Sequence, residues 1–97
     1  MKAKIYNHKI WVTETNPQKL NHYIGKLLKN SGFKIIGTLE YHFHPQGYTS
    51  IFLLSESHCA IHTFPERQKS YIELSSCIWN QFIKFKKNFN LIKTLED

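Results

Sequence analysis

Reactive side chains gather in one short stretch of the sequence, at a break between two predicted strands. The stretch reads Ser55-Glu56-Ser57-His58-Cys59-Ala60-Ile61-His62-Thr63-Phe64-Pro65-Glu66. Hydroxyl, thiol, imidazole and carboxylate groups serve proteins as nucleophiles, acids, bases and metal ligands. A tight turn between two strands is also a place where the backbone can be held under strain. The residue types by themselves offer two kinds of chemistry, metal binding and hydrolysis.

Four histidines are candidate zinc ligands, on strands that we expect to be neighbours. His42 and His44 would lie beside His58 and His62. Because side chains alternate along a strand, His58 and His62 share one face and Cys59 lies on the other. The ligand types suit zinc, but their spacing matches no closed zinc site with paired C-x-x-C ligands. Ordinary half-buried histidines are the simpler interpretation, and we expect no metal.

Nucleophilic hydrolysis is the second possibility. Ser57 with His62 or His58, or Cys77 with a histidine, supplies a nucleophile and a base. The chain has no G-x-S-x-G nucleophile turn. Asp97 is the only aspartate, so a glutamate would have to orient the base. The pattern does not favour this chemistry.

The same stretch resembles a motif for protein self-cleavage. Residues 54–66 read L-S-E-S-H-C-A-I-H-T-F-P-E. This run is similar to E-S-H-x-x-I-H-T-W-P-E, the processing-site motif of the prokaryotic S-adenosylmethionine (AdoMet) decarboxylase proenzymes. Residues 43–49, F-H-P-Q-G-Y-T, resemble the family's F-x-P-x-G-x-S. Cys77 follows Ser57 by 20 residues, where the family has its catalytic cysteine.

The resemblance is clear from Tyr41 to Cys77, and three features depart from the family pattern. Thr49 stands in place of a serine, and Phe64 in place of a tryptophan. Ile78 follows Cys77 directly, without the family's glycine-bearing loop. These departures bear on the substrate pocket more than on self-cleavage.

The resemblance implies that the chain cuts its own Glu56–Ser57 peptide bond. The products would be a β chain of residues 1–56 and an α chain of residues 57–97, within one domain that spans 1–97. The Ser57 hydroxyl would attack the preceding carbonyl carbon in an N-to-O acyl shift, which proximity accelerates. The ester would then break by β-elimination and leave a covalent pyruvoyl group, the cofactor, in place of Ser57.

Other matched positions take the family's roles. Thr49 would donate a hydrogen bond to the oxyanion during cleavage, and His62 would act as the processing base. The pyruvoyl ketone would form a Schiff base with the substrate amine and accept the electrons released by decarboxylation. Cys77 would then protonate the substrate carbon, and its ordinary thiol pKa near 8.5 permits this around neutral pH.

The expected substrate is AdoMet, and the product would serve spermidine synthesis. Phe43 and Glu66 match positions that stack on the adenine and bind the ribose hydroxyls, and His58 would help to place the pyruvoyl group. Ornithine or arginine are alternative substrates for a related pyruvoyl decarboxylase. An unprocessed homologue that only binds or regulates a partner is the alternative from another class. The family also implies a homodimer with active sites near its interface.

The elements that must position these residues follow from hydrophobic periodicity. Strands are predicted over 4–13, 33–42, 48–55, 58–64 and 70–74, and residues 90–95 can add an edge strand. The unbroken run 51–54 suits a strand that is buried on both faces.

Two helices complete the prediction. Asn16-Pro17 starts a helix whose apolar stripe is Leu20, Tyr23, Ile24, Leu27 and Leu28, and Gly32 ends it. A second helix should start at Ser75 or Ser76 and run to Lys87. The class is α+β: a two-layer sandwich of a mainly antiparallel sheet with both helices on one face. A dimer could cover the other face.

The composition describes one small lysine-rich domain. Of its residues, 41% are hydrophobic and 14% aromatic, which is enough to build one hydrophobic core. A length of 97 residues is too short for two domains. The formal net charge is +6, but Arg67 is the only arginine among 13 basic residues. Because base readout favours arginine, we expect a solvated surface and no nucleic-acid partner.

No apolar run approaches the roughly 20 residues of a membrane span, and no secretory signal follows Met1. We therefore expect a cytoplasmic protein that needs no membrane, with Cys59 and Cys77 reduced.

Overall fold

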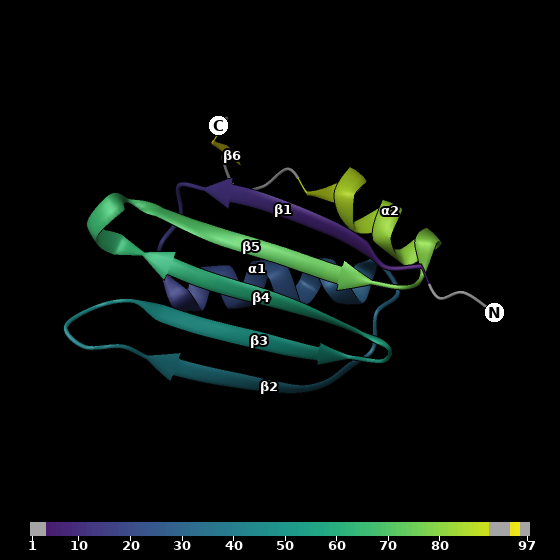
Figure 1. Ribbon diagram of the computed structural model, residues 1–97, viewed down its shortest axis with the longest axis horizontal. Helices are drawn as coiled ribbons and strands as arrows, with labels where there is room; N and C mark the ends of the chain where they lie inside the picture. Colours follow the sequence, from purple (N-terminus) through teal and green to yellow (C-terminus); the bar gives the residue numbers. More distant parts are fainter. Residues whose placement is uncertain (1–3, 90–93, 96–97) are drawn as a thin grey trace.

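The computed structural model describes residues 4–89 and 94–95, which form a sheet and two helices (Figure 1). The elements in chain order are β1 (Tyr6–Val12), α1 (Pro17–Asn30), β2 (Ile35–His42), β3 (Tyr48–Leu54), β4 (Ser57–Phe64), the 3-10 turn η1 (Pro65–Arg67), β5 (Lys69–Ser76), α2 (Trp79–Asn88) and β6 (Thr94–Leu95). The strand order is β2-β3-β4-β5-β1-β6, and each of these neighbouring pairs is antiparallel. β4 and β5 therefore lie at the centre of the sheet.

The helix α1 forms as its sequence predicts. The Asn16 side chain accepts a hydrogen bond from the Lys19 amide at 2.9 Å, and Pro17 occupies the first turn. At the other end Gly32 has φ +96°, a left-handed conformation that glycine adopts without strain. The four aliphatic residues of the predicted stripe are buried against the sheet, and Tyr23 packs partly against the same core.

Both helices cover one face of the sheet, which confirms the predicted two-layer α+β class. Phe82 and Phe85 of α2 and the aliphatic stripe of α1 share one core. The sheet contributes alternate residues to this core: Val12, Phe52, Leu54, Cys59, Ile61, Ile72 and Leu74. No helix within residues 4–89 and 94–95 has both the length and the apolar character to cross a bilayer.

The opposite face of the sheet, here called the open face, has no helix over it. It exposes large apolar side chains near β2, including Leu39 at 71% and Leu53 at 53%. The prediction that the run 51–54 is buried on both faces is wrong for the single chain. Phe52 and Leu54 are buried under the helices, whereas Ile51 and Leu53 are exposed on the open face.

The boundary between β5 and α2 also differs from the prediction. β5 continues to Ser76 and α2 begins at Trp79, so Ser75 and Ser76 do not start the helix. Ser76 stays extended because it pairs with Ser57 of β4 on one side and Tyr6 of β1 on the other. The predicted edge strand is present at β6, which pairs with β1, while residues 90–93 lie outside the described part.

Candidate active site

The predicted site residues lie in two separate hollows, at opposite ends of the central strand β4. The first, the turn hollow, measures about 340 Å³ and lies at the β3–β4 turn. Its lining is Ile5, Glu56, Ser57, His58, Ser75, Ser76 and Cys77. The second, the loop hollow, measures about 300 Å³ and includes Phe43, Thr49, His62, Phe64 and Glu66. In Figure 1 the β3–β4 turn lies at the right-hand end of the sheet, and the β2–β3 loop and η1 lie at the left-hand end.

The turn hollow is built on a strained two-residue hairpin. Leu54 pairs with Ser57, so Ser55 and Glu56 alone make the connection between β3 and β4. Glu56 has φ +63°, in the left-handed region that favours glycine. A residue with a Cβ atom in this region costs of order 1–3 kcal/mol. The strain predicted for this turn is therefore present, and it lies on the residue just before the Glu56–Ser57 peptide bond.

The carbonyl before that peptide bond and the hydroxyl after it each form a hydrogen bond with a residue at the end of β5. The Cys77 thiol donates a hydrogen bond to the Glu56 carbonyl oxygen at 3.2 Å. The Ser57 hydroxyl donates to the Ser76 hydroxyl oxygen at 3.1 Å. β5 places these partners because Ser57 and Ser76 are paired across the ladder and Cys77 follows directly. The carbonyl and the hydroxyl of the predicted cleavage site are thus both held.

The two cysteines differ sharply in access. Cys77 is exposed at the turn hollow, whereas Cys59 is buried in the core. Burial, with a smaller contribution from Glu73, raises the pKa of the Cys59 thiol far above its ordinary value. Cys59 is therefore a neutral core residue, and Cys77 is the thiol available for chemistry.

The loop hollow contains the predicted imidazole base. Thr49 Oγ1 lies 2.8 Å from His62 Nδ1, on the open face of two neighbouring strands. The ring of Tyr71 stacks on His62 with the centroids 6.3 Å apart. Burial, and then the hydrogen bond to Glu73, raise the pKa of the Tyr71 phenol, so it stays neutral near physiological pH.

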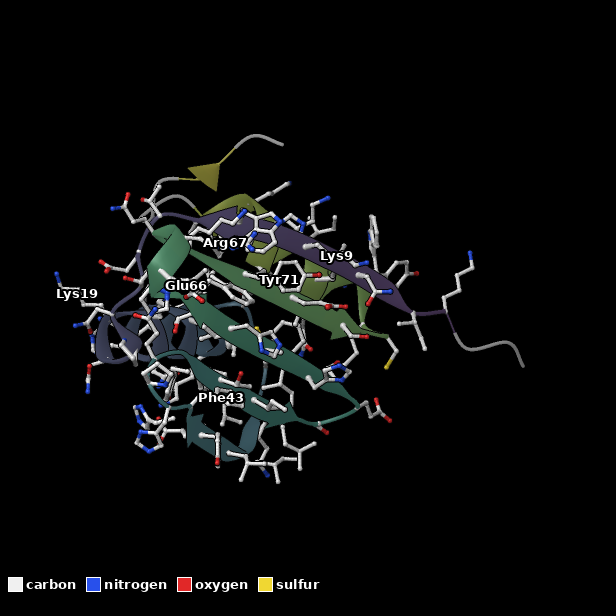
Figure 2. The ribbon with its side chains drawn as sticks, turned by 60° about the vertical axis from the view of Figure 1, so that its left-hand side comes forward. Lys9, Lys19, Phe43, Glu66, Arg67 and Tyr71 are labelled. Carbon is white, nitrogen blue, oxygen red and sulfur yellow. The ribbon has the colours of Figure 1, made fainter. Side chains whose placement is uncertain are left out.

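Phe43 and Glu66 reach the loop hollow from different elements. Phe43 belongs to the β2–β3 loop and is 49% exposed, while Glu66 lies in η1. Figure 2 shows them on either side of β4, with Tyr71 on β5. An exposed ring and a carboxylate at one hollow can stack on a flat heterocycle and accept hydrogen bonds from hydroxyl groups.

A single chain does not bring the two hollows together. His62 follows Ser57 by five positions on one extended strand, which separates their Cα atoms by about 16 Å. The alternation of the strand also puts Ser57 on the helix side and His62 on the open side. Thr49 is equally distant from Ser57, because it pairs with His62.

The four histidines do not gather either. His42 contacts the Tyr48 ring on the helix side, whereas His58 and His62 lie on the open face. In residues 4–89 and 94–95 no three side chains of the kinds that bind metals come close enough to share an ion.

Sequence reasoning missed Ser76 and Tyr71, which contact Ser57 and His62. The sequence favours a helix start at Ser75 or Ser76, where a serine is a common cap. A strand register over 69–76 would have placed Tyr71 on the open face beside His62 and Ser76 opposite Ser57.

Known proteins match this chain in sequence and in fold. The model of the S-adenosylmethionine decarboxylase family matches residues 13–94. An S-adenosylmethionine decarboxylase proenzyme of Clostridium botulinum is 34% identical over 62 residues, which are 64% of this chain and 53% of that protein. One from Prochlorococcus marinus is 37% identical over 49 residues, 50% of this chain and 39% of that protein.

The similarity in fold extends further along the chain. The crystal structure of the adenosylmethionine decarboxylase from Aquifex aeolicus superposes with a TM-score of 0.62 at 19% identity, covering 94% of this chain and 83% of the other. The matched segments span about half the length of the relatives, or less. Because the family model covers most of the sequence, this chain belongs to the S-adenosylmethionine decarboxylase family.

Proposed function

We propose that this protein is a self-processing, pyruvoyl-dependent decarboxylase whose substrate is AdoMet. The observation that carries the proposal is the Glu56–Ser57 peptide. Its carbonyl oxygen accepts a hydrogen bond from Cys77, and Glu56 is held at φ +63°. A strained peptide with a donor on its carbonyl oxygen is prepared for attack at the carbonyl carbon. The named relatives, which are proenzymes, support the same interpretation.

Self-cleavage uses the Ser57 hydroxyl as its nucleophile. Oγ bonds to the Glu56 carbonyl carbon, the carbon–nitrogen bond breaks, and the nitrogen takes up the hydroxyl proton. Negative charge develops on the carbonyl oxygen, where the Cys77 thiol already donates. A base then removes the Ser57 Cα proton, and the ester oxygen leaves with the 1–56 segment as a carboxylate. Tautomerisation and hydrolysis release ammonia and leave a pyruvoyl group at the start of residues 57–97.

The base and a further oxyanion donor come from a second copy of the chain. His62 and Thr49 are hydrogen-bonded together but lie at the far end of β4 from Ser57. A two-fold axis across the middle of β4 would place the loop hollow of one copy over the open side of the β3–β4 turn of the other, and the reverse. His62 would then approach the Ser57 Cα proton from the face opposite to the Ser57 hydroxyl, which points to the helix side. The exposed apolar side chains of the open face, Leu39 and Leu53 among them, favour such a face-to-face contact.

The same arrangement would complete the substrate pocket. A pyruvoyl group supplies a ketone that binds the substrate amine and accepts electrons when carbon dioxide leaves. The turn hollow fits it, because the exposed Cys77 thiol stands beside residue 57 and can deliver a proton to the substrate carbon. Phe43 and Glu66 of the second copy would stack on the adenine and accept the ribose hydroxyls.

The experiment that tests the proposal is the intact mass of the wild-type chain under denaturing conditions. We expect two fragments that divide between Glu56 and Ser57, with the second lighter by one ammonia than a peptide that begins with serine. Carbon dioxide release from AdoMet, ornithine and arginine then assigns the substrate. A chain that stays whole after long incubation would overturn the proposal in favour of a binding or regulatory homologue. Release from ornithine or arginine alone would overturn AdoMet as the substrate.

Replacing Glu56 by glycine is expected to slow cleavage about fivefold to tenfold, because glycine adopts the left-handed turn without strain. The precursor should also become more stable to thermal unfolding. The cleavage rate is measured by pulse–chase labelling in cell-free synthesis, with fragments separated on denaturing gels. Glu56→Ala is the matched control, since it removes the carboxylate but keeps the Cβ atom and the strain. Equal rates for the two variants would rule out a contribution from strain.

A further inference from the structure

Ser76, which the sequence does not mark as a site residue, has a hydroxyl whose hydrogen bonds leave little freedom. Its side chain is 1% exposed at the end of β5. The Ser76 oxygen accepts one hydrogen bond from the Ser57 hydroxyl and one from the Ile78 amide, both at 3.1 Å. Its own hydrogen faces the Ile78 carbonyl oxygen at 3.5 Å.

These contacts set the direction of the Ser57–Ser76 hydrogen bond. A hydroxyl oxygen has two lone pairs, and the Ile78 amide and the Ser57 hydroxyl occupy both on Ser76. Ser57 is the donor in its contact with Ser76, an arrangement that leaves the Ser76 hydrogen on the side of the Ile78 carbonyl. The lone pairs of Ser57 Oγ are not used in this hydrogen bond, so the oxygen keeps the electron pair that a nucleophile needs.

We propose that Ser76 is a positioning residue for self-cleavage, which fixes the rotamer of the Ser57 nucleophile. Together with Cys77, which holds the Glu56 carbonyl, it makes the end of β5 a clamp on both reacting groups. Ser76 takes no proton in this role: the Ser57 hydroxyl proton passes to the departing nitrogen as the ester forms. The inference rests on the proposed function and adds to it a residue that acts only on the first step.

The test is the cleavage rate of Ser76→Ala in cell-free synthesis, beside the wild type. We expect a decrease of roughly tenfold or more, because the nucleophile loses its fixed rotamer. Ser76→Thr keeps the hydroxyl and should retain most of the rate. Ser76→Cys fills the buried space that Ser76→Ala leaves empty, but its thiol accepts hydrogen bonds weakly. It should therefore cleave as slowly as Ser76→Ala, and this agreement would show that the slow cleavage does not come from the lost volume.

Two measurements separate positioning from a structural effect. Ser70 is also a fully buried β5 serine, and its hydroxyl donates to the Glu14 carbonyl at 2.7 Å, far from Ser57. Ser70→Ala should lower thermal stability by a similar amount and still cleave at the wild-type rate. Hydroxylamine, which cleaves esters, should not accelerate fragment release from Ser76→Ala, because the ester forms slowly and does not accumulate.

The outcomes distinguish this inference from the proposed function. If the wild type cleaves and Ser76→Ala cleaves equally fast, the positioning role is overturned and the enzyme stands. Equal slowing by Ser70→Ala, or rapid fragment release from Ser76→Ala with hydroxylamine, would also overturn the role. If the wild type itself stays whole, the proposed function fails first.

Discussion

Replacing Ser57 by alanine is expected to abolish both cleavage and decarboxylation. In the proposed mechanism the Ser57 oxygen is the nucleophile of the acyl shift and the same residue is the precursor of the pyruvoyl group, so the variant loses both functions. Ser57 Oγ lies in the turn hollow with the Glu56 carbonyl held by Cys77 beside it. The intact mass of the variant should be that of the full chain after any incubation. Carbon dioxide release from AdoMet should fall to background.

Ser55→Ala is the matched control for this experiment. Ser55 is the other residue of the same two-residue turn, and its side chain is exposed. This variant should cleave and decarboxylate like the wild type. Fragments from Ser57→Ala that still divide after residue 56 would place the nucleophile elsewhere, and Cys77 would be the next candidate because its sulfur contacts the same carbonyl oxygen.

The sequence predicted the fold well where local signals and tertiary packing agree. The Asn16-Pro17 start, the apolar stripe and Gly32 define α1 by local hydrogen bonding and periodicity, and the helix forms there. The end of β5 could not be predicted in the same way. A serine pair before an apolar run is typical of a helix start, but pairing with strands on both sides keeps Ser76 extended.

The candidate site residues are close together in the sequence, but their closeness in the chain does not predict where the fold places them. Strand geometry separates them: Ser57 and His62 lie on opposite faces and far apart along β4. The left-handed conformation of Glu56 depends on the two-residue hairpin. The contact from Cys77 depends on the β4–β5 register, which pairs Ser57 with Ser76. The proposal that two copies share the site accounts for a motif that is compact in sequence and divided in the fold.

That division leads to a complementation prediction. Ser57→Ala and His62→Ala should each fail to cleave when made alone, the first for lack of a nucleophile and the second for lack of the base. When the two are made together, mixed dimers contain one site with Ser57 from the His62→Ala copy and His62 from the Ser57→Ala copy. We expect the His62→Ala chain to be cut in this mixture, and the Ser57→Ala chain to stay whole. A mass tag on one chain identifies which chain is cut.

The control partner is the double variant with both Ser57→Ala and His62→Ala. It supplies neither the hydroxyl nor the imidazole, so the His62→Ala chain should stay whole in its presence.

Hydroxylamine gives a second readout. If His62 serves the elimination step, His62→Ala made alone should accumulate the ester, and the reagent should then release fragments. Cleavage of His62→Ala without a partner, at the wild-type rate, would show that His62 is not the base. If tagged mixed dimers form and the His62→Ala chain still stays whole, the two hollows do not meet across the interface. The base would then have to come from the turn hollow itself, where His58 is the imidazole that lines it.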